Sequence, residues 1–191
     1  MDILNFSSQT FCFIGNIYFM FFILFLLLMT QQFHAFQTSI IVGASSMLIN
    51  ANLKLLFQVP LMAHLGNGFA FPSGHLQIAT VFYGSLCALH LLDKKVYGFL
   101  LTAIAWAIFY QNYHAPLELL GGFISGMIVI CLFFYTPLLE HKLILFIIST
   151  LLIGNIWLHQ YFFSHFIMPY SILTLMLSIN LRLSLKAFKK N

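Results

Sequence analysis

Two histidines are the residues of this sequence best placed to do chemistry. His75 closes the stretch FPSGH at positions 71–75, and His114 follows 39 residues later, in the stretch NYHAPLE at positions 112–118. Both stretches interrupt long apolar runs. Only 6% of the residues are charged, and an ionisable side chain at membrane depth is costly and is by default a functional candidate. The candidates are Lys54, His75, His114 and Glu118.

The FPSGH stretch has the features of an anion site at the start of a helix. Ser73 and Gly74 directly precede an apolar run, so Ser73 is a suitable N-cap residue and the backbone N–H groups near Gly74 are expected to point outward. Such N–H groups bind phosphate and similar anions. The same residues also fit a simple turn followed by a helix cap, and the motif alone does not decide between the two interpretations.

His114 and Glu118 are four residues apart, which suits an interaction between their side chains. If the segment turns tightly, the carboxylate accepts a hydrogen bond from one imidazole nitrogen and leaves the other as a nucleophile or base. Pro116 favours an extended Ala115, so a regular helix through His114 is not expected and the contact is a hypothesis. Taken singly, a histidine at a membrane interface is more often structural than catalytic, and Lys54 alone fits a snorkelling side chain.

The order and spacing of these residues resemble the type-2 phosphatidic acid phosphatase superfamily of membrane lipid phosphatases and phosphotransferases. That family's pattern is Lys, six residues, Arg-Pro; then Pro-Ser-Gly-His; then Ser-Arg, five residues, His, three residues, Asp. Here Lys54, the Pro-Ser-Gly-His of positions 72–75, and His114 followed at the fourth position by Glu118 match it in order. The resemblance covers roughly positions 52–126.

The resemblance implies a lipid-phosphatase-like helical core over about 36–136 and a role for each candidate. His114 would attack phosphorus and form a phosphohistidine, His75 would protonate the leaving group, and Glu118 would orient His114. The phosphate would be held by Lys54, Ser73 and Gly74. The implied reaction needs no metal or other cofactor, and the implied substrate is a phospholipid or an isoprenyl phosphate.

The sequence departs from the family pattern at both arginines. Leu61-Met62 stand where the family has Arg-Pro, and Ala107-Ile108 stand where it has Ser-Arg. Arginine grips phosphate through two parallel charge-assisted bonds, and neutralising the transferring group is most of what such a site does. Neutral donors are available nearby from Gln58, Asn67, Gln111 and Asn112, but they do not replace the missing charge.

Two accounts fit these departures. In the first, which the retained lysine, histidines and carboxylate favour, the protein is an enzyme, and a bulky or less charged phosphodiester tolerates the missing arginines, so that transfer between lipids is a variant. In the second, the fold persists without catalysis, as a membrane scaffold or a lipid-binding subunit. A transporter or channel is disfavoured, because no matching halves with broken helices are found.

The elements that position these residues are apolar helices. The chain is 61% hydrophobic with a mean hydropathy of +0.97, and segments of ~20 apolar residues, the length that crosses a bilayer, recur throughout. We predict an all-α, polytopic bundle of six to seven transmembrane helices in a single domain, 1–191, with an extra hairpin at 142–184. The predicted helices are 11–30, 36–56, 73–92, 96–113, 116–135, 143–163 and 166–183. A loop at 58–72 precedes the third.

The basic residues predict the orientation of the bundle. Lys94, Lys95, Lys142 and the basic tail fall on one side of a seven-helix arrangement, which is then cytoplasmic. The two histidine motifs share the opposite face. We expect a multi-pass protein of a bacterial inner membrane, with its site on the outer, periplasmic side. The eight Lys and Arg residues are scattered and form no nucleic-acid-binding stripe, so the expected partners are membrane lipids and other membrane subunits, as a homo- or hetero-oligomer.

Overall fold

The structure, a computed structural model, describes residues 3–135, which fold into α-helices joined by short turns and one longer loop. The helices are α1 (Ile3–Ile14), α2 (Ile17–Met29), α3 (Phe33–Phe57), α4 (Gly74–Ala88), α5 (Lys94–Tyr110) and α6 (Pro116–Tyr135), and a 3-10 turn, η1 (Ala63–Leu65), lies in the loop. The all-α prediction is confirmed for this part of the chain. The predicted helices at 143–163 and 166–183, with Lys142 and the basic tail, lie outside the described residues.

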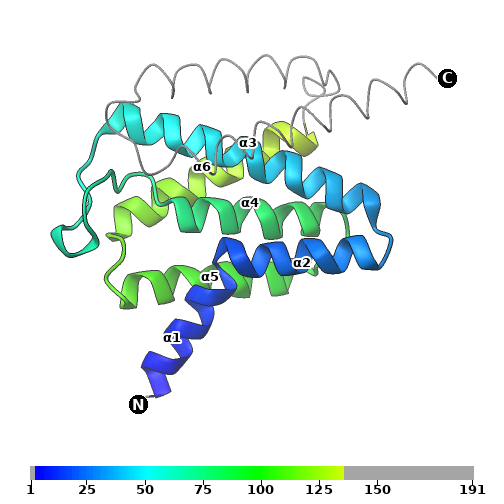
Figure 1. The fold of residues 1–191 in the computed structure, drawn as a ribbon, viewed down its shortest axis with the longest axis horizontal. Helices are drawn as coiled ribbons and strands as arrows, with labels where there is room; N and C mark the ends of the chain where they lie inside the picture. The colour runs from blue at the N-terminus through cyan, green and yellow to red at the C-terminus, as the bar shows by residue number, and fades with distance from the viewer. Residues whose placement is uncertain (1–2, 136–191) are drawn as a thin grey trace.

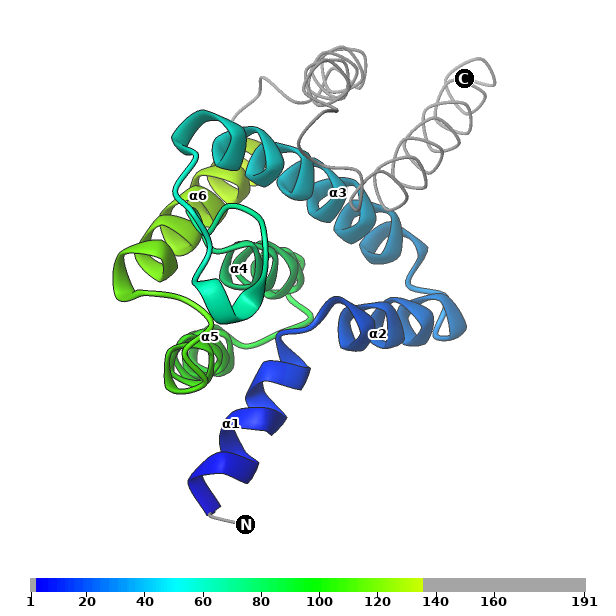
Figure 2. The ribbon, with the colours of Figure 1, turned by 60° about the vertical axis from the view of Figure 1, so that its left-hand side comes forward.

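Helix α4 is the centre of the bundle. It packs against α3, α5 and α6, which surround it in Figure 2. Ten of its 15 residues are buried, and Leu76, Phe82 and Leu86 join a core that includes Ile104 of α5 and Met20 of α2. A helix that is buried on most sides must be apolar all round rather than amphipathic. The sequence of α4 is largely apolar on all faces, and its buried polar residues, such as Gln77, are hydrogen-bonded inside the bundle.

Two glycines bring α6 close to α4. A Cβ atom on Gly122 would lie 2.5 Å from the carbonyl oxygen of Ser73, and one on Gly126 would lie 2.8 Å from Cβ of Thr80. Small residues four apart let two helix backbones approach closely in membrane proteins. The close approach fixes Glu118, in the first turn of α6, beside the start of α4, where the Ser73 N–H donates to the Glu118 carbonyl over 3.0 Å.

The predicted helix at 11–30 is wrong, because the chain breaks at Gly15 and Asn16. The two halves, α1 and α2, are bent by 54° relative to each other. Asn16 is the N-cap of α2, and its side chain accepts the N–H of Tyr18 over 3.0 Å. The Tyr83 hydroxyl donates to the carbonyl of Ile14 over 2.7 Å. A polar cap and a tertiary bond thus replace the continuous helix that hydropathy alone predicts.

The other predicted helices in this part of the chain are found with small changes at their ends. The helix predicted at 116–135 begins and ends as expected, and α3 and α5 differ from 36–56 and 96–113 by one to three residues at each end. The helix predicted at 73–92 ends early, at Ala88. After it the chain turns through His90, which has a φ of 59°.

Two of these helices, α3 and α6, are long and apolar enough to cross a membrane, and the bent pair α1 and α2 makes a third if it is one span. Helices α4 and α5, with 15 and 17 residues, are shorter than the ~20 residues of a full span. Large apolar side chains such as Phe22, Phe99 and Phe123 are exposed on the outer helices. Lipid would cover such a surface.

The helix ends that carry the sequence motifs meet at one end of the bundle. The last turn of α3, the first turn of α4, the end of α5 and the start of α6 lie together in Figure 1, beside the loop at 58–73. This arrangement follows from the alternation of helix direction along the chain. Lys54 and both histidines are therefore brought to the same end.

Candidate functional site

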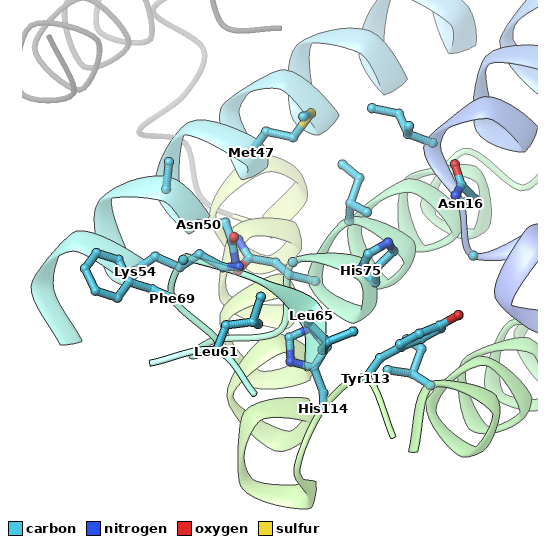
Figure 3. A pocket seen from close by; sticks show the side chains of 18 of the residues that line it. Asn16, Met47, Asn50, Lys54, Leu61, Leu65, Phe69, His75, Tyr113 and His114 are labelled. Carbon is cyan, nitrogen blue, oxygen red and sulfur yellow. The ribbon is translucent and has the colours of Figure 1, made fainter. Parts of the chain in front are cut away.

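A cavity of about 770 Å³ opens at this end of the bundle. Its walls come from the corner between α1 and α2, from α3, from the loop at 58–73, from the start of α4 and from the turn between α5 and α6 (Figure 3). The cavity has the size of a small-molecule or cofactor site. Among the candidates from the sequence, Lys54, Gly74, His75 and His114 line it.

The two histidine rings lie near each other in the wall of this cavity. Their centroids are 6.4 Å apart and their planes are inclined by 56°, and Figure 3 shows both rings in the centre of the site. Two histidines beside one bound group can supply a nucleophile and a proton donor to it. The two rings lie close enough together to act on one group bound in the cavity.

Glu118 holds the ring of His114 from behind. Its Oε2 lies 2.7 Å from His114 Nδ1 and accepts the N–H of Ala115 over 3.1 Å. Because α6 begins at Pro116, Glu118 is the third residue of the helix and closes half of a capping box. The predicted contact is confirmed, and it forms across the helix start. With an ionised carboxylate, which only accepts hydrogen bonds, Nδ1 carries the proton and Nε2 has a free lone pair.

The surroundings favour a neutral His114. Burial lowers the pKa of the imidazole below its usual 6.5, and the charge of Lys54 lowers it further, while the hydrogen bond and charge of Glu118 act in the opposite direction. Only 6% of the His114 surface is exposed. A neutral imidazole whose second nitrogen is bonded to a carboxylate is the form that a nucleophile or base needs.

Ser73 and Gly74 have different places at the start of α4. Ser73 is completely buried, and its hydroxyl caps the helix by accepting the N–H of Leu76 over 3.5 Å. The N-cap prediction is thus confirmed, and it is Gly74 that lines the cavity. The N–H groups of Gly74 and His75 belong to the first helical turn, where backbone donors have no intrahelical partner.

Apolar side chains stand at both positions where the family pattern has arginine. Leu61, from the loop, and Ile108, from α5, line the same cavity as the histidines. Of the neutral donors proposed from the sequence, Asn67 lines the cavity. Gln111 instead donates to Ser8 and Asn5 of α1, over 2.6 and 3.0 Å.

A buried polar network forms part of the cavity wall, and it was not predicted from the sequence. Gln77, fully buried, donates to the carbonyl and hydroxyl of Ser46 over 3.0 and 3.1 Å. Its Oε1 accepts from Asn50 and Ser125, each over 2.8 Å. The network joins α3, α4 and α6. The sequence does contain a signal for this network, because Ser46, Asn50, Gln77 and Ser125 are polar residues within apolar helical segments. Such residues are costly in a membrane and are usually paired.

Three further lining residues, Asn16, Asn50 and Tyr113, were also absent from the predicted site. Asn50 is positioned by the network, because its Nδ2 donates to Gln77 and to the carbonyl of Pro72. Within residues 3–135, no three His, Cys, Asp or Glu side chains gather as metal ligands.

Comparisons of the chain with protein-family models, with curated proteins and with solved structures found no match.

Proposed function

We propose that this protein is a membrane lipid phosphatase or lipid phosphotransferase that acts through a phosphohistidine. The observation that carries the proposal is the pair of histidine rings, 6.4 Å apart, one of them held by a carboxylate. The arrangement supplies a nucleophile, a group that orients it and a second titratable ring on the opposite side of the reacting group. Lys54 adds a positive charge to the same cavity.

The reaction proceeds in two steps. His114 Nε2 attacks phosphorus as the bond to the leaving oxygen breaks, and His75 gives that oxygen its proton. Water, or the hydroxyl of a second lipid, then attacks the phosphohistidine, gives its proton to His75 and breaks the Nε2–P bond. Glu118 stabilises the positive charge that develops on the His114 ring. Lys54 and the N–H groups at the start of α4 hold the phosphoryl oxygens.

The same proposal includes a topology. The chain is a multi-pass protein of a bacterial inner membrane, with a lipid-phosphatase-like core, its cavity on the outer face and its C-terminus inside, as the distribution of lysines favours. Reporter fusions test this orientation. A reporter at the C-terminus should be cytoplasmic and one in the 58–72 loop external, and finding both on one side would contradict it.

The activity is tested with the purified full chain in detergent, without added metal. Phosphatidate, an isoprenyl diphosphate and a phosphodiester lipid are offered, and release of phosphate, of diacylglycerol or of a transferred headgroup is measured. His114→Ala removes the attacking nitrogen and should lower turnover by about 10⁴-fold or more.

The matched control is His64→Ala. His64 is an exposed histidine in η1, so its loss should leave turnover unchanged. A wild type without activity on any of the three substrates would exclude the catalytic proposal.

A catalytically inactive scaffold or lipid-binding subunit is the second candidate. It is favoured by one observation, the apolar side chains of Leu61 and Ile108 in the cavity wall. An apolar wall binds lipid without stabilising a highly charged transition state. Lipid binding with no turnover by wild type or by His114→Ala would support this candidate.

A further inference from the structure

We propose that the cavity selects a phosphodiester lipid, whose phosphate carries a single negative charge, over a phosphomonoester dianion. This inference rests on the proposed function and names its substrate class. It is argued from the charges and the walls of the cavity.

The fixed charges around the histidines are few. Among the described residues that line the cavity, Lys54 is the only lysine, arginine, aspartate or glutamate. The carboxylate of Glu118, bonded to His114 at 2.7 Å, opposes the charge of Lys54. When His75 is protonated to act as the acid, these three groups leave one net positive charge. A monoanion balances it, whereas a dianion leaves an uncompensated charge in a largely apolar cavity, which is costly.

The walls fit a phosphate that carries two substituents. A phosphate group fills a small part of about 770 Å³. Leu61 and Ile108 line the cavity, and Figure 3 shows Leu61 beside His114. Met47 and Leu55 of α3 add further apolar surface to its wall. These side chains offer no donors to additional phosphoryl oxygens, but they make favourable contact with an esterified group.

The selectivity is measured with phosphatidylglycerol and phosphatidate of identical acyl chains. Attack by His114 releases the same diacylglycerol from both, and hydrolysis of the phosphohistidine then gives glycerol phosphate or inorganic phosphate. At pH 8 phosphatidate is largely a dianion, because the second pKa of a phosphomonoester is about 6. We expect kcat/KM for phosphatidylglycerol to exceed that for phosphatidate by about 10-fold or more. At pH 6 the ratio should narrow, since about half of the phosphatidate is then a monoanion.

Leu61→Arg tests the cause of the selectivity. Leu61 is half-buried in the loop, so arginine there adds a charge to the wall without opening the helical core. It should shift the ratio towards phosphatidate by about 10-fold, and the uncharged variant Leu61→Gln should not. A wild-type preference for phosphatidate at pH 8 would overturn the inference, as would a ratio that is the same at both pH values.

Binding separates this inference from the proposed function. Competition of each lipid against a fluorescent phospholipid is measured at pH 8 on the same preparations. If neither lipid is turned over but phosphatidylglycerol binds more tightly, the catalytic function fails and the charge selectivity stands. If phosphatidate binds more tightly, the selectivity fails whether or not turnover is seen.

Discussion

Two polar groups of residues lie next to each other on the same helices and are built in opposite ways. The network of Gln77, Asn50, Ser46 and Ser125 is closed, because the side-chain nitrogens and oxygens of Gln77 all have partners. The site of Lys54, His75, His114 and Glu118 is open. The hydrogen bond between its side chains joins His114 to Glu118, and Lys54, His75 and His114 line the cavity.

The comparison distinguishes polar residues that are paired with one another inside the fold from polar residues that are left open at a cavity. A satisfied buried network joins helices and defines one packing, whereas polar atoms left open at a cavity cost free energy unless a ligand binds them. Asn50 and Lys54 are one helical turn apart on α3, and Gln77 follows His75 by two residues on α4. Damage to the network should therefore act on stability, and damage to the site on activity.

The largest effect on stability is expected from Gln77→Leu. The substitution removes the bonds to Asn50, Ser46 and Ser125 and leaves buried donors and acceptors without partners. We expect the free energy of unfolding to fall by about 2–4 kcal/mol, measured by denaturant titration in detergent micelles.

Gln9→Leu is the control for Gln77→Leu, because Gln9 is exposed on α1 and should change stability little. Turnover per folded molecule of Gln77→Leu should fall far less than that of His114→Ala. If Gln77→Leu unfolded like the wild type, the network would not hold the three helices together.

A smaller effect, on activity, is expected from Glu118→Gln. The Ala115 N–H donates to the oxygen that also binds His114, so the amide should place its own oxygen there and keep the His114 tautomer. The variant then loses charge but keeps orientation. Replacing a charge-assisted bond by a neutral one should lower kcat by about 10- to 100-fold.

Glu118→Ala is the comparison variant, since it loses orientation as well as charge and should lower kcat further. The free energy of unfolding should also differ between the two variants. The Glu118→Gln side chain still caps α6, whereas Glu118→Ala removes the cap and should be less stable. Equal activities of the two variants would show that the carboxylate does not orient His114.

The sequence predicted the parts of the fold and site that depend on local signals. Pro116 marked the start of α6, Ser73 marked the start of α4, and the spacing of His114 and Glu118 indicated their contact. The break at Gly15 and Asn16 was missed because hydropathy averages over a window, although Gly-Asn is itself a turn signal. Lys54 and the two histidines meet because α3, α4, α5 and α6 alternate in direction.

The partners of Gln77 could not be predicted from local signals. They come from three helices, and their bonds depend on how α3, α4 and α6 are rotated about their axes. Hydropathy and spacing do not determine that rotation. The positions of Leu61 and Ile108 could not be predicted from the sequence either. Spacing shows that they differ from the family pattern, but only the fold places them in the cavity wall.

The smallest effect is a dependence of stability on pH that distinguishes the two groups. The folded-state pKa of His114 lies below its usual 6.5, chiefly because of burial. The unfolded chain therefore takes up this proton first as the pH falls. The contribution of His114 to stability is full above about pH 6.5 and is lost as the pH falls through the lowered pKa. The free energy of unfolding, measured between pH 5 and pH 8, should decrease in this window.

His114→Asn isolates this contribution, because it removes the titrating ring. The part of the decrease in unfolding free energy at acid pH that is due to His114 should then disappear. In Lys54→Met the loss of stability at acid pH that is due to His114 should be smaller, since the charge of Lys54 is one of the causes that lower the pKa of His114. Gln77→Leu gives the contrast, because amides and hydroxyls do not titrate in this range and its curve should be displaced equally at every pH. An unchanged acid loss in His114→Asn would mean that His114 is not held neutral, and the site would then lack the nucleophile that separates it from the network.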